Sequence, residues 1–195
     1  MIDYFEKTIH TISNSISSVD AKKFEILLNT LEEKLNAGGK IIASGLGKNV
    51  PICEKFIGTL NSLGINAVFL NTHTALHGDL GVIKENDIVL LLTKSGNTEE
   101  SILLANHLLE RKAEIWLISF NRNSKLIKLL NHSIILDLES EGDGWDIIPN
   151  NSTSVYLILL QGLAMMLRDR MNISLKEFKN NHPAGSIGET LRELK

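Results

Sequence analysis

Residues 93–100 read TKSGNTEE and combine hydroxyl side chains, a glycine and two glutamates in one short stretch. Thr93, Ser95 and Thr98 supply the hydroxyl groups, and Gly96 allows the backbone to turn tightly. The predicted helix that follows aims free N–H groups and the positive end of its dipole at the same point. An anion is the natural ligand of such a loop, and phosphate is the most common one. We therefore predict a phosphate-binding loop here.

Two further loops offer related chemistry. Residues 44–49 read SGLGKN, in which Gly45 and Gly47 let the backbone approach a ligand and Lys48 offers a positive charge to a phosphate or a polarised oxygen. A third loop, PNNST, opens a long predicted helix and adds these phosphate-binding candidates: Asn151, Ser152 and Thr153. Helix capping alone also explains any one of these loops, so the prediction depends on their combination in one small sheet.

The SGLGKN loop fits neither of the familiar nucleotide-binding motifs. The phosphate-binding loop of nucleoside triphosphatases requires a glycine and a hydroxyl residue at the positions of Ile42 and Asn49. A dinucleotide-binding fingerprint requires a third glycine at Val50 and an acidic residue at Asn71. These differences argue against nucleotide binding.

Two histidines lie in loops whose surroundings suit a polar site. His77 belongs to THTALHGDLG, residues 72–81, where Asp79 could orient its ring. His182 lies in NHPAG, next to a proline and close to a flexible glycine. A zinc site formed by His73, His77 and His182 would lack a regular ligand spacing, so we predict no metal site and no cofactor.

Short β-branched segments alternate along the chain with longer segments of helical period. The predicted strands are residues 40–44, 66–70, 87–93, 114–120 and 132–138. Because these strands are hydrophobic at successive positions, we predict a doubly wound α/β fold with a parallel sheet covered on both faces. Two helices precede the sheet, at residues 3–19 and 20–39, with Asp20 as an N-cap, and a long apolar helix is expected at residues 152–171. Ligands of such sheets bind outside the carboxyl ends of the strands.

Composition limits the functions that this chain can have. With 195 residues, 43% of them hydrophobic, we expect one domain over residues 1–195, with helices in 1–39 and the sheet core in 40–195. A net charge of -3 does not provide the basic face that a nucleic-acid partner needs. No apolar segment has the roughly 18 to 20 residues of a membrane helix, so we predict no membrane partner. A single cysteine and the lack of a signal-peptide pattern favour a cytoplasmic location.

The motifs GLGK, HGDLG, TKSGNTEE, NSTS and NHPAG follow one another in this chain. In this order they resemble the sugar isomerase (SIS) domain of arabinose-5-phosphate isomerases, and the resemblance extends from Lys40 onward. HGDLG and HPAG are specific to this branch, whereas SGxT occurs across the superfamily. The resemblance implies a five-stranded flavodoxin-like sheet that binds a small-molecule sugar phosphate and interconverts aldose and ketose phosphates. It also implies these catalytic residues: Lys48, His77, Glu100, Glu141 and His182.

The resemblance also implies an assembly and draws attention to variable positions. Family members form homotetramers in which a neighbouring subunit completes each site, and the long predicted helix is a suitable partner surface. The chain differs from the family at Asn49 and Val50, where serine and glycine are common, and at residues 142–151, which read GDGWDIIPNN. We expect a single-domain form without the tandem CBS regulatory domains, in which Trp145 and Asp146 influence the choice of sugar.

The expected reaction interconverts D-arabinose 5-phosphate and D-ribulose 5-phosphate through an enediol. It requires an acid or base for ring opening, a base that moves a proton between C1 and C2, and stabilisation of negative charge on oxygen. We expect Glu100 or Glu141 to move the proton, His77 or His182 to assist ring opening, and Lys48 to stabilise the charge.

Two alternatives stay open at this point. A non-catalytic sugar-phosphate sensor or regulatory SIS module would need the phosphate loops but not the proton-transfer groups. No helix-turn-helix segment precedes the predicted sheet, which argues against a DNA-binding form of such a sensor. The 3-hexulose-6-phosphate isomerases share the phosphate loop but lack HGDLG, which this chain contains.

Overall fold

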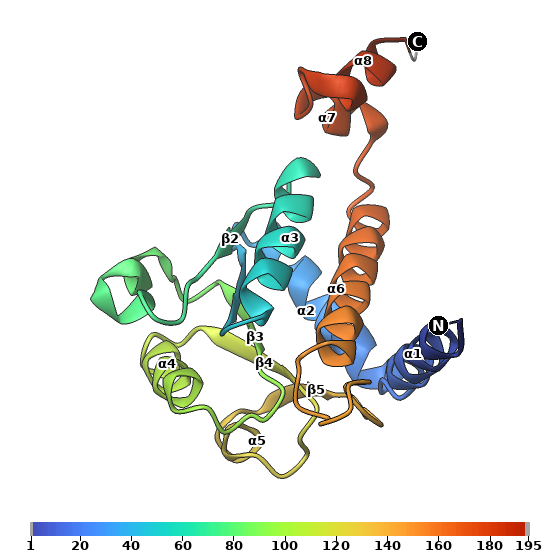
Figure 1. The fold of residues 1–195 in the computed structure, drawn as a ribbon. Helices are drawn as coiled ribbons and strands as arrows, with labels where there is room; N and C mark the ends of the chain where they lie inside the picture. The colour runs from blue at the N-terminus through green and yellow to red at the C-terminus, as the bar shows by residue number, and fades with distance from the viewer. Residues whose placement is uncertain (1, 194–195) are drawn as a thin grey trace.

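A five-stranded parallel sheet forms the centre of the molecule in the computed structural model, which describes residues 2–193 (Figure 1). Its strands are β1 Ile41–Gly45, β2 Ala67–Phe69, β3 Ile88–Leu92, β4 Glu114–Ser119 and β5 His132–Ile135. They are arranged in the order β2-β1-β3-β4-β5. This order is the flavodoxin-like form of a doubly wound sheet, so the predicted fold class is confirmed.

Helices flank the sheet and extend beyond it. They are α1 Ile2–Ser17, α2 Ala21–Asn36, α3 Asn49–Ser62, α4 Glu99–Glu110, α5 Lys125–Leu129, α6 Asn151–Arg170, α7 Leu175–Asn180 and α8 Gly185–Glu193, with the 3₁₀ turns η1 Ala75–His77 and η2 Asp79–Val82. The predicted N-cap of α2 is confirmed, because the Asp20 carboxylate accepts hydrogen bonds from Lys22 N and Lys23 N. The short helices α5, α7 and α8 were not predicted. A capping box of Ser174 and Glu177 opens α7.

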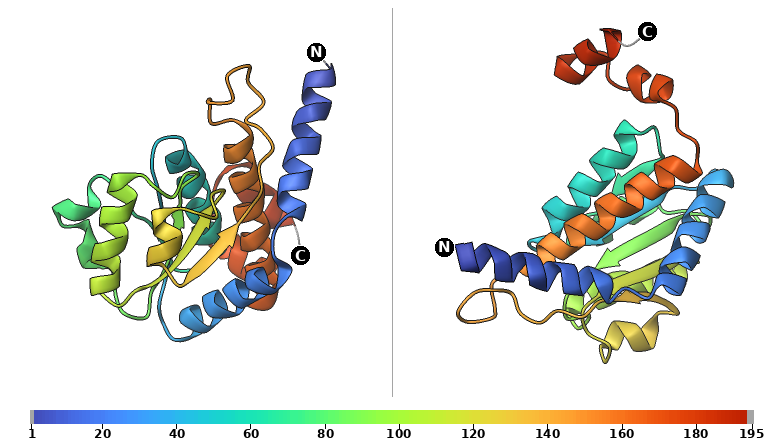
Figure 2. Two further views of the ribbon diagram at one scale, coloured as in Figure 1. Left: turned by 90° about the horizontal axis from the view of Figure 1, so that it is seen from below. Right: turned by 90° about the vertical axis from the view of Figure 1, so that its right-hand side faces the viewer.

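The central strands are hydrophobic at successive positions because helices cover both faces of the sheet (Figure 2). Every residue of β1 and β3 is buried. Along β1, Ile41 and Ala43 belong to the core formed with α2, α3 and α6, whereas Ile42 belongs to the core formed with α4 and α5. The two cores hold the sheet rigidly between two helical layers.

The register of the sheet brings the ends of its central strands together. Gly45 at the end of β1 pairs with Leu92 at the end of β3, and Leu92 pairs with Ile118 of β4. The loops that follow β1, β3 and β4 therefore leave the sheet at the same edge.

Two segments project from this edge and lie side by side, the N-terminal part of α1 and the loop of residues 142–149 (Figure 2). They are joined by a hydrogen bond of 3.3 Å from Asn150 Nδ2 to the Tyr4 hydroxyl. Among residues 2–193, no helix is long and apolar enough to cross a membrane.

Candidate active site

The carboxyl ends of the strands and the N-termini of α3, α4 and α6 lie at one edge of the sheet (Figure 1). The winding direction of the sheet reverses between β1 and β3, which is where sheets of this type bind ligands. All predicted site residues except His182 lie at this edge, on strand ends, loops and helix starts.

The loop after β3 is held in one conformation by its own contacts. The hydroxyl of the buried Thr93 accepts a hydrogen bond from Gly96 N at 3.2 Å. Gly96 has a φ of +62°, and a Cβ at this position would lie 2.3 Å from Ser124 Oγ. Only glycine suits both the backbone conformation and the close approach, which confirms the predicted tight turn.

The hydroxyl groups of Ser95 and Thr98 lie close together beside this turn. Their oxygens are 3.4 Å apart, and Ser95 Oγ also accepts a hydrogen bond from Asn97 N at 3.2 Å. Thr98 is the N-cap residue of α4, yet its side chain makes no capping hydrogen bond. The first N–H groups of α4 have no partner within the helix, so these donors and the two hydroxyls together suit an anion.

Glu100 follows the predicted phosphate loop by two residues. It lies in the first turn of α4 and its side chain is exposed, as is that of Glu99. A carboxylate in the first turn is favoured by the helix dipole, which gives both residues a structural reason to be acidic. A side chain in this turn is also within reach of a ligand held at the start of the helix.

Lys48 is presented by a tight loop between β1 and α3. A Cβ at Gly45 would lie 2.8 Å from the Cβ of Asn49, and Gly47 has a φ of +57°. Asn49 Nδ2 donates to Leu92 O at 3.3 Å and so ties the start of α3 to the end of β3. Lys48 itself is exposed at the N-cap of α3. The Asn49 side chain therefore has a structural role.

Buried hydroxyl groups attach the histidine loop to β1. Ser44 Oγ and Thr72 Oγ1 lie 2.8 Å apart, and Thr72 Oγ1 also donates to Gly45 O at 3.2 Å. Because these atoms are buried, their hydrogen bonds fix where the loop leaves the sheet.

His77 lies at the end of η1, with its side chain exposed. Asp79, the acid that could orient its ring, accepts a hydrogen bond from Thr74 Oγ1 at 2.7 Å instead. The structure thus places His77 at the expected edge of the sheet, whereas Asp79 stabilises the loop.

Glu141 is fully buried, and every contact of its carboxylate is with a donor. Oε1 lies 2.6 Å from Lys94 Nζ and 2.7 Å from Ser152 Oγ, while Oε2 accepts from Ser152 N at 2.9 Å and Asn150 N at 3.0 Å. Burial raises the pKa of this carboxyl, but the Lys94 ammonium and the donors of the helix start outweigh burial and hold the pKa below its ordinary value. Glu141 is therefore ionised near neutral pH and poorly suited to accept a proton.

These contacts change how the start of α6 is interpreted. Ser152 donates to Glu141 with both its N–H and its hydroxyl. Asn151 Nδ2 donates to Ser140 O at 3.0 Å, and the Thr153 hydroxyl donates to a backbone oxygen at 2.8 Å. The anion at this helix N-terminus is thus an internal carboxylate, and the side chains expected to bind phosphate here make hydrogen bonds within the protein.

His182 lies at the other end of the molecule. Its Nδ1 lies 2.8 Å from Phe178 O, and its ring contacts the Phe178 ring in a tilted arrangement, with the centroids 4.1 Å apart. With Leu63 and Arg168 it lines a cavity at the C-terminal ends of α3 and α6, whereas Lys48 lies at the N-terminus of α3. Because α3 has 14 residues and is about 21 Å long, His182 cannot join the other site residues within one protomer.

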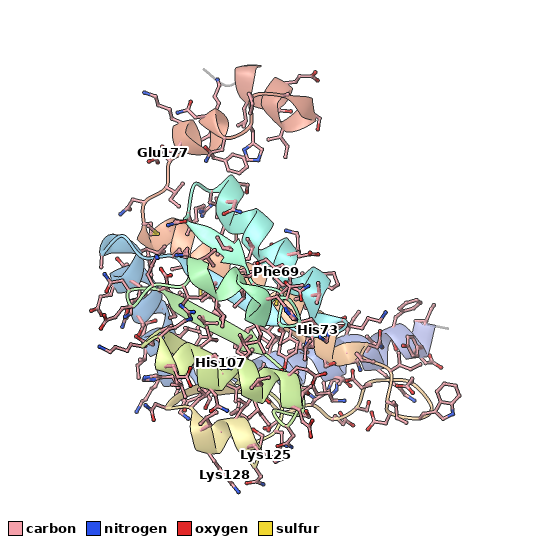
Figure 3. All side chains as sticks on the ribbon, turned by 90° about the vertical axis from the view of Figure 1, so that its left-hand side faces the viewer. Phe69, His73, His107, Lys125, Lys128 and Glu177 are labelled. Carbon is pink, nitrogen blue, oxygen red and sulfur yellow. The ribbon has the colours of Figure 1, made fainter. Side chains whose placement is uncertain are left out.

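Figure 3 shows this separation through two labelled residues, Glu177 on α7 and His73 in the loop that carries His77. The tail with Glu177 stands away from the edge where His73 lies. The same separation means that His73, His77 and His182 do not meet in one protomer.

Two residues near the site were not predicted. Lys94, the second residue of TKSGNTEE, contacts Glu141, so the motif contained this signal. Asn121, in the loop after β4, donates from Nδ2 to Ser95 O at 2.9 Å and supports the phosphate loop. Local sequence could not identify Asn121, because its role depends on the pairing of β3 with β4.

Comparison with known proteins identifies the domain. The SIS domain model matches residues 34–166 of this chain. The matched range contains Lys48, His77, Glu100 and Glu141, and it ends before His182.

The curated relatives include proteins with and without a described activity. A Chlamydia pneumoniae protein of uncharacterised function is 37% identical over 157 residues, which cover 80% of this chain and 48% of that protein. An arabinose 5-phosphate isomerase of Francisella tularensis is 31% identical over 185 residues, which cover 95% of this chain and 55% of that protein. The chain thus spans about half the length of the curated relatives that it matches.

Solved structures share the fold over almost the whole chain. An Escherichia coli CFT073 protein in complex with arabinose 5-phosphate has a TM-score of 0.85 and 25% identity, with 92% of this chain and 94% of that chain covered. The Vibrio vulnificus NanR protein complexed with ManNAc-6P has a TM-score of 0.71 and 16% identity, with 98% of this chain and 68% of that chain covered. The similarity to NanR shows the fold alone.

Proposed function

The chain belongs to the SIS domain family, and we propose that it is an aldose–ketose isomerase that interconverts D-arabinose 5-phosphate and D-ribulose 5-phosphate. One observation carries the proposal: the exposed carboxylate of Glu100 lies in the first turn of α4, two residues after the loop of residues 93–98. A sugar anchored there by its phosphate would present its carbon chain to a base on the same element. The arabinose 5-phosphate isomerase of F. tularensis and the E. coli complex with arabinose 5-phosphate agree with this choice of substrate.

The phosphate is held by the loop after β3. Ser95 and Thr98 supply hydroxyl groups, Gly96 lets the backbone turn, and the start of α4 supplies N–H groups and a favourable dipole. The Thr93 hydroxyl shapes the turn through its bond with Gly96 N rather than by facing the ligand. Because these donors are fixed in place, little conformational entropy is lost when the anion binds.

We assign the proton transfer between C1 and C2 to Glu100. The two glutamates differ in environment: Glu100 is exposed at the start of α4, whereas Glu141 is buried with a lowered pKa and four donor contacts. A base must be free to accept a proton from carbon, which Glu141 could do only by losing its contacts with Lys94 and α6. Glu141 instead holds the start of α6 in place.

Lys48 and His77 complete the part of the site that one protomer provides. Both are exposed at the edge formed by β1 and its neighbours. Lys48 stabilises negative charge on the enediol oxygen, and His77 transfers the proton that opens the sugar ring.

A second copy of the chain supplies His182 to this site. Within one protomer His182 lies about the length of α3 from Lys48, so it can act only on the site of another subunit. Exposed apolar side chains on α6, Ile158, Met165 and Met166, offer a surface for such an assembly. We propose a homotetramer in the cytoplasm as the active form.

The second candidate is a sugar-phosphate sensor without catalytic activity. The loop of residues 93–98 favours it, because its hydroxyl and N–H donors suit a phosphate whether or not a base acts beside it. A sensor would bind the sugar phosphate through the loop of residues 93–98 and would not depend on Glu100.

A turnover experiment separates the two candidates. Purified protein is incubated with D-arabinose 5-phosphate, and the formation of D-ribulose 5-phosphate is followed by ¹³C NMR, with sugar binding measured in parallel by calorimetry. We expect turnover by the wild type and a loss of at least about 100-fold in Glu100→Gln with retained binding. Saturable binding without turnover by the wild type would establish the sensor.

A further inference from the structure

A cavity of about 310 Å³ lies beside the phosphate loop, at the carboxyl ends of β3, β4 and β5. It is lined by Lys94, Ser95, Phe120, Asn121, Leu138, Ser140 and Asp146. Ser95 belongs both to this cavity and to the phosphate loop, so a ligand held by the loop can extend into the cavity. Its volume is at the lower end of the range for small-molecule sites.

Lys94 connects this cavity to the buried carboxylate of Glu141. Its ammonium lies 2.6 Å from Glu141 Oε1, yet the side chain is 43% exposed whereas Glu141 is fully buried. An ammonium group has three donors, and the contact with Glu141 uses one of them. The backbone of Lys94 is also fixed, because its carbonyl accepts from Ser119 Oγ at 3.1 Å and from Phe120 N at 3.3 Å.

Asp146 provides an acceptor among the residues that line the same cavity. Its Oδ1 accepts a hydrogen bond from Glu141 N at 2.6 Å, which leaves Oδ2 for a further contact. Asp146 has a φ of +56°, a backbone conformation that residues other than glycine seldom adopt and that often marks a functional position. The lining of the cavity therefore contains a cation and a carboxylate that each contact Glu141.

Resting on the isomerase proposed above, we infer that this cavity binds hydroxyl groups of the sugar close to its phosphate, while C1 and C2 lie at Glu100, with Lys94 and Asp146 as substrate-contacting residues that determine specificity. The Lys94 ammonium donates to one hydroxyl oxygen and Asp146 Oδ2 accepts from a neighbouring hydroxyl. Such a pair recognises the spacing and configuration of adjacent hydroxyl groups, because each group bonds well in only one arrangement.

The alternative ligand for this cavity, a second phosphate, fits its charges poorly. The Lys94 ammonium is already paired with the Glu141 carboxylate, and Asp146 adds a second carboxylate to the lining of the cavity, so a dianion would meet no net positive charge there. Phosphate is better accommodated at the start of α4, where the nearby groups are N–H and hydroxyl donors.

The test compares two ligands that differ only in the sugar. Calorimetry measures the Kd of D-arabinose 5-phosphate and of inorganic phosphate for the wild type and Lys94→Gln. The control is Lys34→Gln, which removes an ion pair of 3.5 Å with Glu114 outside the site. We expect the Kd of the sugar phosphate to rise about tenfold or more in Lys94→Gln and that of inorganic phosphate to change less than about twofold, with neither changed in the control.

The possible outcomes lead to different conclusions. Equal changes for both ligands, or no change for either, would overturn the role of Lys94 while leaving the proposed isomerase intact. A wild type that binds the sugar phosphate no more tightly than inorganic phosphate would overturn both proposals. Binding with the expected difference but no turnover would overturn the isomerase alone. If Lys94→Gln does not fold, Asp146→Asn provides the same comparison, and an unchanged sugar affinity there overturns the inference.

Discussion

Replacement of Glu141 by glutamine tests the assigned role of this residue, because glutamine has the same shape but no charge. The carboxylate accepts from Asn150 N and Ser152 N on one oxygen, and contacts Ser152 Oγ and Lys94 Nζ on the other. In either orientation, the glutamine side chain places its NH₂ group, which is a donor, next to two donors of the protein. These two donors then have no acceptor. Each such loss in a buried site costs about 1–3 kcal/mol, and the lost interaction with the helix dipole adds up to about 2 kcal/mol.

We therefore expect Glu141→Gln to lower the free energy of unfolding by about 2–4 kcal/mol. The loss stays below the full value for a buried ion pair because Lys94 is partly exposed. For a chain of this size the corresponding fall in Tm is about 5–15 °C. Urea unfolding and thermal denaturation measure both. The matched control is Glu139→Gln, two residues away and exposed, which we expect to change stability by less than about 0.5 kcal/mol.

The pH dependence provides a second check on the same variant. The pKa of Glu141 is lower in the folded state than in the unfolded state, since the Lys94 and helix contacts outweigh burial. The stabilisation by the ionised group is therefore fully present above the unfolded pKa of about 4.3 and is lost as pH falls through the lower folded pKa. The difference between wild type and variant should shrink on acidification below about pH 4. A loss under about 1 kcal/mol at pH 7, or a difference that does not depend on pH, would refute the reasoning.

Three further predictions concern other parts of the site and the core. Gly96→Ala should destabilise the protein by about 2 kcal/mol or more and abolish phosphate binding in calorimetry, because the new Cβ would lie 2.3 Å from a neighbouring side-chain oxygen. The control Gly47→Ala, at an open position, should lower the free energy of unfolding by only about 1 kcal/mol. Similar losses in the two variants would contradict this prediction. Burial raises the pKa of Cys53 to about 12, so its thiol should not react with a disulfide reagent at pH 8 until the protein unfolds, and rapid reaction of the native protein would be inconsistent with the fold. Lys48→Ala and His182→Ala should each be inactive alone but recover about a quarter of the wild-type activity when coexpressed, and no recovery would exclude a site shared between subunits.

The fold was predictable because its signals are local. Segments such as Ile88–Leu92 are hydrophobic at successive positions and so indicate a strand covered on both faces. Asp20 indicates the start of α2 through its capping side chain. The helices of the tail were missed because α7 and α8 are short, and the capping box at Ser174 was the only local signal for α7.

The site was only partly predictable because its electrostatics depend on contacts between distant segments. Gly96 could be identified from its motif, since a tight turn before a helix requires glycine. The different environments of Glu100 and Glu141 could not be predicted from the sequence, because the burial of Glu141 depends on the position of α6 relative to β3. The position of His182 depends on the packing of the tail, which no motif specifies.

The most direct test of the proposed function measures the incorporation of solvent deuterium at C2 of the aldose product. Wild-type protein, Glu100→Gln and the neighbouring control Glu99→Gln are incubated with D-ribulose 5-phosphate in deuterated buffer, and deuterium at C2 of the arabinose 5-phosphate formed is followed by NMR. We expect the wild type and Glu99→Gln to incorporate deuterium during turnover and Glu100→Gln to lose both product and label. Undiminished labelling in Glu100→Gln would contradict the account, because the proton would then be moved by another group.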